Sequence, residues 1–242
     1  MKDQSEFSLH RIATIRSCYP ERFGIPRQAG LVKSARASIV FEATSDNELA
    51  VRDIESFSHL WVVFVFHKLN CSGFIPLVQP PRLGGKKSIG VYATRSPNRP
   101  NPIGLSAVPL ERVEYGVTEI LLHIQAGDFL DGTPVLDIKP YVPFADSIVE
   151  ARSEWAVSAE PTLPVAWSTV ALDELASAEP NTARAAELQL LIEETISLDP
   201  RPAHERGKDG KSDQTWGMRF HHTDVKWSVH NGTAEIVSVA VV

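Results

Sequence analysis

The sequence predicts a mainly β protein with a single-sheet β-barrel as its N-terminal domain and a small α+β C-terminal domain. Three observations support this prediction. Five short runs rich in β-branched and aromatic residues lie within the first 150 residues. Only one segment there, residues 46–54, has helical character. Beyond residue 151 the apolar residues recur with a helical period before strand-like alternation returns.

The five runs are expected to be strands because Gly, Pro, Asn or Asp bounds each of them. Tyr115-Gly116 and Asp131-Gly132 supply turn residues that tolerate a positive φ angle. Strands without intervening helices are typical of a barrel or sandwich, not of βαβ units. The expected strands are Arg36 to Phe41, His59 to His67, Ser88 to Tyr92, Glu119 to Gln125 and Pro134 to Ile138.

Prolines crowd one part of the N-terminal half. Seven of the seventeen prolines fall between Pro76 and Pro109. Proline fixes φ and lacks an N–H group, so the segment is predicted to be neither a continuous strand nor a helix. We expect a loop whose shape is set before any ligand binds.

The C-terminal part begins after a linker marked by Pro161 and Pro164. Ser168 is expected to cap a short helix through Ala176, and Thr182 a longer one that ends before Asp199-Pro200. Three alternating segments should then form strands near Trp216 to Phe220, Val225 to Val229 and Ala234 to Val241. The expected division is a β-barrel domain over 1–150, a linker over 151–164, and a small α+β domain over 165–242.

The charge distribution is uneven. The net charge of −6 argues against a nucleic-acid partner. From Ser56 to Leu110, however, there is no Asp or Glu, and the six cations are Lys68, Arg82, Lys86, Lys87, Arg95 and Arg99. A buried strand explains the lack of charge at Leu60 to Phe66 but not six cations without an anion. We therefore expect a surface that faces an anion, with phosphate the first candidate.

Several functional classes lack support in the sequence. The longest apolar run, Leu60 to Phe66, is too short to cross a membrane, and the first fifteen residues do not resemble a secretory signal. The two cysteines form no metal or redox pair, so we expect a cytoplasmic protein with no membrane and no metal. No Gly-x-Gly-x-x-Gly loop is present, and Gly84 to Ser88 lacks the upstream glycine of a nucleotide-binding loop.

Two stretches carry most of the chemistry. Residues 95–106 hold two arginines and two asparagines on a backbone that prolines restrict. Their polar side chains are therefore held in fixed positions, and little conformational entropy is lost when a ligand binds. Residues 128–141 place carboxylates beside the turn Asp131-Gly132, which could bind hydroxyls and an ammonium group. A simple hairpin would also explain this turn.

Together these stretches resemble the TsaA/TrmO family, whose bacterial members are S-adenosylmethionine-dependent tRNA methyltransferases built on a β-barrel. Pro26-Arg27-Gln28 and His67-Lys68 extend the resemblance over most of residues 5–148. Asp199-Pro200-Arg201-Pro202 and residues 216–220 and 225–227 resemble the extra domain of the longer members. The resemblance implies N6-methylation of threonylcarbamoyladenosine, immediately 3′ of the anticodon in threonine tRNA, giving m6t6A. It also implies a homodimer with the cofactor near the subunit interface.

The resemblance further implies which residues bind S-adenosylmethionine. Arg95 would bind its carboxylate, Asp131 would accept from ribose hydroxyls or the ammonium group, and Leu105 would cover the adenine face. No residue identifies itself as a catalytic base. The expected cofactor-binding set is Pro26, Arg27, Gln28, His67, Lys68, Arg95, Leu105, Asp131, Gly132, Thr133 and Pro134.

Two alternatives stay open at this point. One is a non-catalytic barrel that binds S-adenosylmethionine or a nucleotide, against which the C-terminal domain argues. The other is a cyclophilin-like peptide binder, which leaves the acid-free segment unexplained. For the methyltransferase we expect Trp216 and Trp227, among C-terminal cations, to contact the anticodon loop of the tRNA. A barrel truncated after Pro161 should then keep cofactor affinity and lose tRNA methylation.

Overall fold

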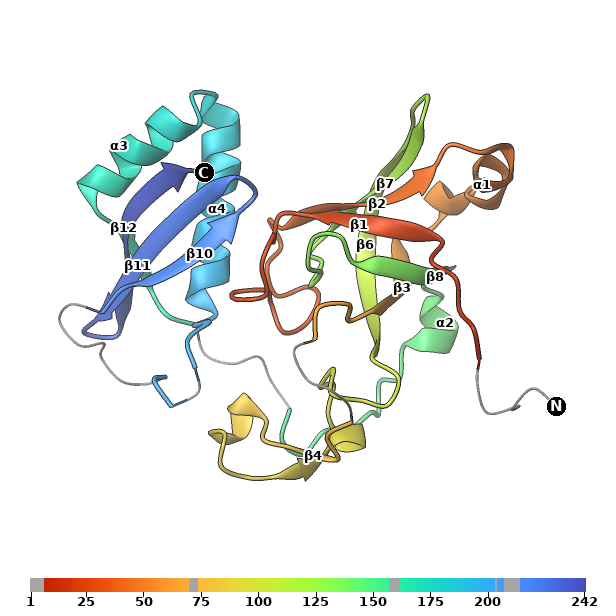
Figure 1. Cartoon of the computed structure of the whole chain (residues 1–242), viewed down its shortest axis with the longest axis horizontal. Coiled ribbons are helices and arrows are strands. Elements are labelled where there is room, and N and C mark those ends of the chain that lie inside the picture. Colours follow the sequence, from red (N-terminus) through yellow and green to blue (C-terminus); the bar gives the residue numbers. More distant parts are fainter. Residues whose placement is uncertain (1–6, 70–73, 157–161, 203, 207–213) are drawn as a thin grey trace.

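The N-terminal part is a closed six-stranded antiparallel barrel with strand order β1-β2-β7-β6-β3-β8 (Figure 1). The computed structural model describes residues 7–69, 74–156, 162–202, 204–206 and 214–242, so Cys71 lies outside it. The barrel strands are β1 (Ala13–Ser17), β2 (Arg36–Glu42), β3 (His59–Val65), β6 (Ile103–Tyr115), β7 (Glu119–Gln125) and β8 (Pro134–Pro140).

Alternation along each strand fills the barrel interior. In β3, Leu60, Val62 and Phe64 are buried while their neighbours are more exposed. Successive side chains of a strand point to opposite faces, so every second residue enters the core. The predicted strands at 36–41, 59–67, 119–125 and 134–138 are confirmed to within two residues at each end.

Strand β6 corrects the prediction of a loop as far as Pro109. Residues 103–109 pair with β3, and Pro109 lies opposite His59. From Leu110 onward the strand pairs with β7 instead, after an irregularity between Leu110 and Arg112. A proline is tolerated where pairing changes partner because its missing N–H interrupts no continuous ladder.

The predicted strand from Ser88 to Tyr92 is also wrong in part. Only β5 (Ile89–Gly90) is extended, and it pairs with β4 (Leu77–Val78) in a separate two-stranded sheet. A 3₁₀ turn, η3 (Val91–Ala93), follows it, and another, η2 (Pro81–Leu83), lies within the hairpin. The prolines around this segment explain why it stays outside the barrel sheet.

Short helices lie at the barrel end where β2 and β8 finish and β3 begins. The predicted helix at 46–54 corresponds to α1 (Ser45–Ala50) and the 3₁₀ turn η1 (Ile54–Ser56). Thr44 caps α1 by accepting from the N–H of Asn47, and Asp53 separates the two elements with a φ of 62°. A further short helix, α2 (Pro143–Asp146), follows β8.

The C-terminal part is a small α+β unit, as predicted. Its elements are β9 (Val165–Trp167), α3 (Thr169–Ala178), α4 (Thr182–Ser197), β10 (Trp216–Phe220), β11 (Thr223–His230) and β12 (Thr233–Val241). The sheet order is β10-β11-β12-β9, in which the unpredicted β9 lies parallel to β12. Ser168 caps α3 as predicted, whereas the cap of α4 is Asn181, one residue before the expected Thr182.

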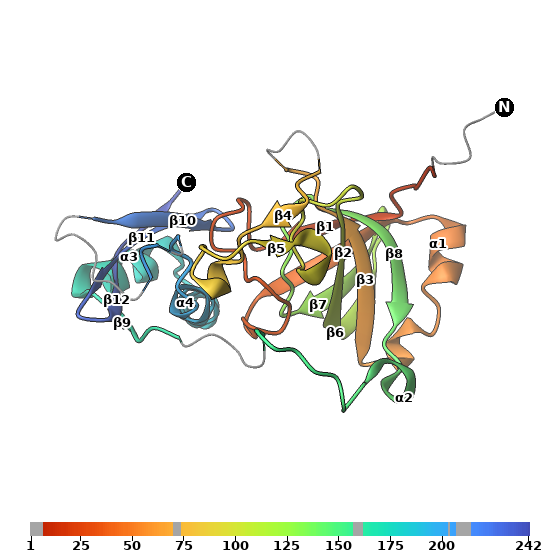
Figure 2. The same ribbon diagram turned by 90° about the horizontal axis from the view of Figure 1, so that it is seen from below.

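The two parts share a core, and Figures 1 and 2 show the segment between β1 and β2 beside the C-terminal part. Four residues from the segment between β1 and β2 are buried in the apolar cluster of the C-terminal sheet and helices, namely Cys18, Tyr19, Val32 and Ala35. The hydroxyl of Tyr19 lies 3.2 Å from that of Thr195 in α4. Within the described ranges, no helix is both long and apolar enough to cross a bilayer.

Candidate functional site

The topology brings every predicted cofactor residue to one end of the barrel. Antiparallel pairing places the last residues of β1, β3 and β7 beside the first residues of β2, β6 and β8. The predicted residues come from the three connections at that end, β1–β2, β3–β6 and β7–β8, from the third residue of β6 (Leu105) or from the first residue of β8 (Pro134). The C-terminal part packs at this same end, since its core includes residues between β1 and β2.

The turn from Asp131 to Pro134 is fastened to β1. The N–H of Asp131 donates to the Tyr19 carbonyl at 2.8 Å, and the N–H of Gly132 donates to the Ile15 carbonyl at 2.9 Å. One carboxylate oxygen of Asp131 accepts from the N–H of Ser17 at 2.8 Å. Gly132 has a φ of 76°, a conformation that favours glycine. The turn is therefore held against the end of β1, and among the described residues no hydrogen bond engages the second carboxylate oxygen of Asp131.

Thr133 has a structural role in the same turn. Its hydroxyl donates to the Leu130 carbonyl at 2.6 Å, and the residue is buried. Its own carbonyl accepts from the N–H of Ile15 at 2.9 Å. With these groups engaged, Thr133 supports the turn and offers a ligand little.

Two histidines lie near Asp131, one from each part of the protein. The His67 Nε2 atom lies 3.9 Å from where a Cβ on Gly132 would stand. Desolvation and the Lys68 charge lower the pKa of His67, while Asp131 opposes that shift. Desolvation and His222 lower the pKa of His221, which Asp131 again opposes. His221 follows β10, so the C-terminal part contributes to the surroundings of this turn; sequence analysis did not select it.

Arg95 belongs to a second set of interacting polar side chains at the same barrel end. Its guanidinium donates to the side-chain carbonyl of Gln28. Its charge also acts on Asp128, whose carboxylate accepts from Ser106 at 2.7 Å. Burial raises the pKa of Asp128, although Ser106 and Arg95 oppose this shift. Arg95 is exposed and paired with a neutral amide, so its charge is available to an anion.

The remaining predicted residues differ in exposure. Pro26 is buried, whereas Arg27 and Lys68 are exposed. The Lys68 carbonyl accepts from Arg22 at 2.8 Å, which ties the end of β3 to the segment before β2. Leu105 is 54% exposed and points away from the barrel core. An exposed leucine at the rim can cover a flat apolar ligand group.

The C-terminal part holds the segment that carries residues 26–28. The Glu194 carboxylate in α4 accepts from both the N–H and the hydroxyl of Ser34, each at 2.8 Å. The N–H of Arg219 donates to Glu21 at 3.0 Å, and the N–H of His221 donates to the Cys18 carbonyl at 2.9 Å. These partners are far apart in the sequence, so no local sequence pattern predicts the contacts.

The expected role of the C-terminal tryptophans needs correction. Trp227 is 0% exposed and belongs to the core, and the Trp216 ring lies beside it, tilted by 31° with ring centroids 5.2 Å apart. Arg201 is 1% exposed, forms a bidentate ion pair with Asp199 and lies over Trp216. Trp227 is thus a packing residue, and Arg201 is not a solvated cation. Two of the other C-terminal cations expected near the tRNA, Lys208 and Lys211, lie outside the described residues.

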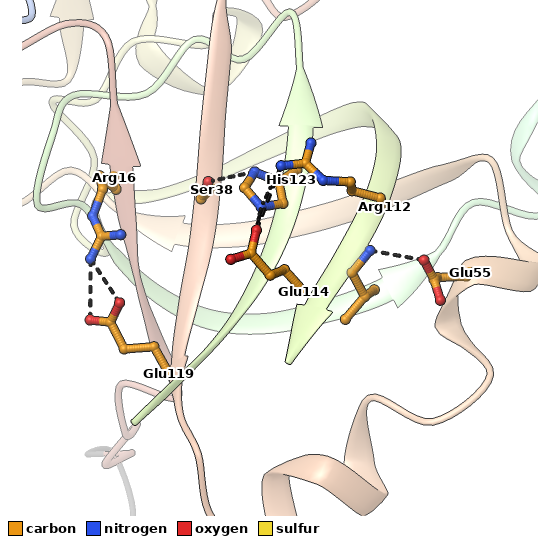
Figure 3. Close-up of polar contacts among 8 residues, drawn as sticks. Arg16, Ser38, Glu55, Arg112, Glu114, Glu119 and His123 are labelled. Atoms are coloured by element: carbon orange, nitrogen blue, oxygen red, sulfur yellow. Dashed lines mark hydrogen bonds and ion pairs between the residues drawn. The ribbon is translucent and has the colours of Figure 1, made fainter. Parts of the chain in front are cut away.

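A Ser-His-Glu cluster stands on the outer face of β2, β7 and β6 (Figure 3). His123 Nδ1 lies 3.2 Å from the Ser38 hydroxyl, and Nε2 lies 3.0 Å from the Glu114 carboxylate. Arg112 also contacts both His123 and Glu114. The groups sit on strands whose N–H groups are paired in the barrel, so the cluster lacks the oxyanion donors of a hydrolase. In the described part of the chain, no group of three His, Cys, Asp or Glu residues could hold a metal ion.

Comparisons with known proteins agree with this arrangement. Residues 14–147 match the tRNA-methyltransferase O N-terminal domain, and residues 160–242 match the TrmO C-terminal domain. A tRNA (adenine(37)-N6)-methyltransferase of Escherichia coli is 42% identical over 97% of this chain and 98% of its own length. One from Eikenella corrodens is 44% identical over 77% of this chain and 99% of its own.

A solved structure gives the same result for the fold. A crystal structure of TrmO from Pseudomonas aeruginosa superposes with a TM-score of 0.78 and 33% sequence identity, covering 98% of this chain and 100% of that one. The two domain families together match most of the chain, and the solved structure covers nearly all of it. The chain belongs to the tRNA-methyltransferase O family.

Proposed function

We propose that this protein is an S-adenosylmethionine-dependent tRNA methyltransferase that methylates N6 of the adenine at position 37. Its substrate base is threonylcarbamoyladenosine, which becomes m6t6A. The observation that carries the proposal is the gathering of Arg95, Gln28, His67 and Asp131 at one barrel end in a chain of this family. Sequence-distant polar groups that converge on one rim indicate a ligand site.

The residues at this rim fit the chemistry of S-adenosylmethionine. The cofactor carries a carboxylate, an ammonium group, ribose hydroxyls and a flat adenine. The exposed guanidinium of Arg95 suits the carboxylate, and the free oxygen of Asp131 suits the ammonium group or a hydroxyl. Leu105 offers an exposed apolar surface for the adenine. Arg27, Lys68 and Gly132 are exposed at the same end and complete the proposed site.

Bound S-adenosylmethionine supplies a methyl group on a positively charged sulfur. The protein's part is to hold the acceptor nitrogen in line with this group and to keep water out. His67 is neutral near pH 7 because its pKa is lowered, so its ring can accept a hydrogen bond as well as donate one. No group is assigned as the base that takes the N6 proton.

Finer features of the function are part of the proposal. We take the anticodon stem-loop of threonine tRNA as substrate, and a homodimer as the active species. We also propose that the reaction takes place in the cytoplasm. We also propose a division into a barrel over 1–150, a linker over 151–164 and a C-terminal domain over 165–242, which the family matches over 14–147 and 160–242 support. The alternative is a barrel that binds S-adenosylmethionine without catalysis.

Methyl transfer to defined tRNA separates these possibilities. The full chain is incubated with methyl-labelled S-adenosylmethionine and threonine tRNA, with or without the threonylcarbamoyl group, in the presence of a chelator. We expect label only in the threonylcarbamoylated tRNA, at N6 of the modified base. Cofactor binding in calorimetry with no transfer to any tRNA would favour the non-catalytic alternative. Activity that requires added zinc or magnesium would contradict the metal-free site.

A further inference from the structure

Two exposed aromatic rings lie side by side on the proline-rich segment, outside the proposed cofactor residues. The ring centroids of Phe74 and Tyr92 are 6.2 Å apart, and their planes differ by 25°. Tyr92 is 69% exposed and Phe74 is 48% exposed. Rings that contribute to folding are normally buried against apolar neighbours. This pair instead presents flat apolar surface to solvent.

The backbone holds both rings in place. The N–H of Val91 donates to the Pro76 carbonyl at 2.9 Å, and the N–H of Ile75 donates to the Asn98 carbonyl at 3.3 Å. Val91 is buried, so it anchors the 3₁₀ turn that carries Tyr92. Prolines restrict the same segment further. Little conformational entropy remains to be lost when a ligand contacts the rings.

Arg99 orients Tyr92 and adds positive charge beside it. The guanidinium carbon lies 5.4 Å from the Tyr92 ring centroid. One nitrogen of the same group donates to the carbonyls of Thr94 at 2.8 Å and Val91 at 3.3 Å. The arginine is thus fixed to the backbone of the turn. It contacts the ring without neutralisation by a carboxylate in any described ion pair.

The surroundings of the rings are strongly cationic. They belong to the stretch from Ser56 to Leu110, which has no acidic residue. Lys86 and Lys87 are exposed in the hairpin between β4 and β5, and no described carboxylate pairs with them. Figure 1 shows this hairpin below the barrel, and in Figure 2, seen from below, it lies in front of the barrel. A polyanion is therefore attracted to the face that carries the rings.

Exposed rings among cations are the combination that binds unpaired nucleotides, because phosphates meet the cations and bases stack on the rings. A two-fold contact with a second copy through this same face is disfavoured, because it would bring two cationic surfaces together. The C-terminal Trp227 does not compete for this role because it is buried. We propose that Phe74 and Tyr92 form the surface on which unpaired bases of the anticodon loop stack, an inference that rests on the proposed function.

Binding of a threonylcarbamoylated anticodon stem-loop RNA to the full chain tests this inference. Tyr92→Ala and Phe74→Leu each remove a flat ring, and each should weaken RNA binding by about 5- to 150-fold. Tyr92→Phe keeps the ring and should bind as the wild type does. Tyr115→Ala is the matched control, because Tyr115 is also an exposed tyrosine but lies beside Glu114 at the far end of β6. Calorimetry with S-adenosylmethionine should give the same affinity for all four variants.

Three results would be decisive against one proposal or the other. Wild-type RNA affinity in both Tyr92→Ala and Phe74→Leu would overturn the stacking surface. So would a loss of RNA binding that accompanies a shift from dimer to monomer in sedimentation, since the face would then join two copies of the chain. If the ring variants lose RNA binding but the wild type methylates no tRNA, the proposed function fails and the RNA surface stands.

Discussion

Replacing Glu194 by alanine tests whether α4 holds the segment between β1 and β2 in its place. One carboxylate oxygen of Glu194 accepts two hydrogen bonds from Ser34, both at 2.8 Å. A hydrogen bond to a charged acceptor contributes about 1.5–3 kcal/mol, and water can replace part of it at this half-buried site. We therefore expect Glu194→Ala to lower the free energy of unfolding by about 1.5–3 kcal/mol in total. For a chain of this size that corresponds to a fall in Tm of about 3–12 °C.

The same variant should weaken S-adenosylmethionine binding. The Glu194 contact restrains the segment that carries Gln28, and Gln28 accepts the hydrogen bond from Arg95. Thermal unfolding and calorimetry measure the two effects, and Glu194→Gln should fall between wild type and alanine because it keeps a neutral acceptor. Glu187→Ala is the control, an exposed glutamate on the same helix. If Glu194→Ala matches Glu187→Ala in both measurements, the reasoning is refuted.

Three further predictions concern the barrel end and core. Arg95→Ala should raise the cofactor Kd by a factor equivalent to about 1.5–3 kcal/mol with Tm nearly unchanged, and Arg95→Lys should restore only part of the affinity; an equal loss of stability would make Arg95 structural. Because the raised pKa of Asp128 means that the folded state holds this proton more tightly, wild-type stability falls as pH rises through that pKa. Asp128→Asn should thus be more stable than wild type at pH 7, and urea midpoints should converge as the pH falls toward about 4; a constant difference would contradict this. Gly104→Ala would place a Cβ 2.2 Å from the Phe64 ring, so it should lower the free energy of unfolding by about 1–3 kcal/mol, and an unchanged urea midpoint would show that the ring moves aside freely.

The barrel strands could be predicted because their residues alternate in burial along short, well-bounded runs. In β7, Ile120, Leu122 and Ile124 are all buried, and the polar residues Glu119 and Gln125 mark its two ends. The predicted cofactor residues are likewise brought to one end by a topology that the strand order alone establishes. A local pattern suffices for the strands because the signal lies in neighbouring residues, whereas the cofactor-binding set was implied by the family resemblance.

Features set by distant partners could not be predicted. Pro109 looks like a strand breaker, and only the change of partner at Leu110 shows why β6 continues through it. Tyr19 and Thr195 lie 176 positions apart in the sequence, and no motif around either residue predicts their hydrogen bond. The burial of Trp227 could not be predicted for a related reason. The alternation of apolar residues predicts that Trp227 lies on a strand, but it does not show which face of the sheet the helices cover.

The shared core changes what removal of the C-terminal part should do. If the barrel were self-contained, truncation after Pro161 would leave cofactor affinity near that of the full chain and abolish only tRNA methylation. Cys18, Tyr19, Val32 and Ala35, however, are buried against that part, and truncation would expose them to water. The segment they anchor carries Gln28, so we expect the truncated barrel to lose affinity for S-adenosylmethionine as well as methylation. Calorimetry on the truncated barrel, with circular dichroism to verify folding, measures this loss. A folded truncated barrel that binds the cofactor as tightly as the full chain would show that the barrel end is rigid without its partner.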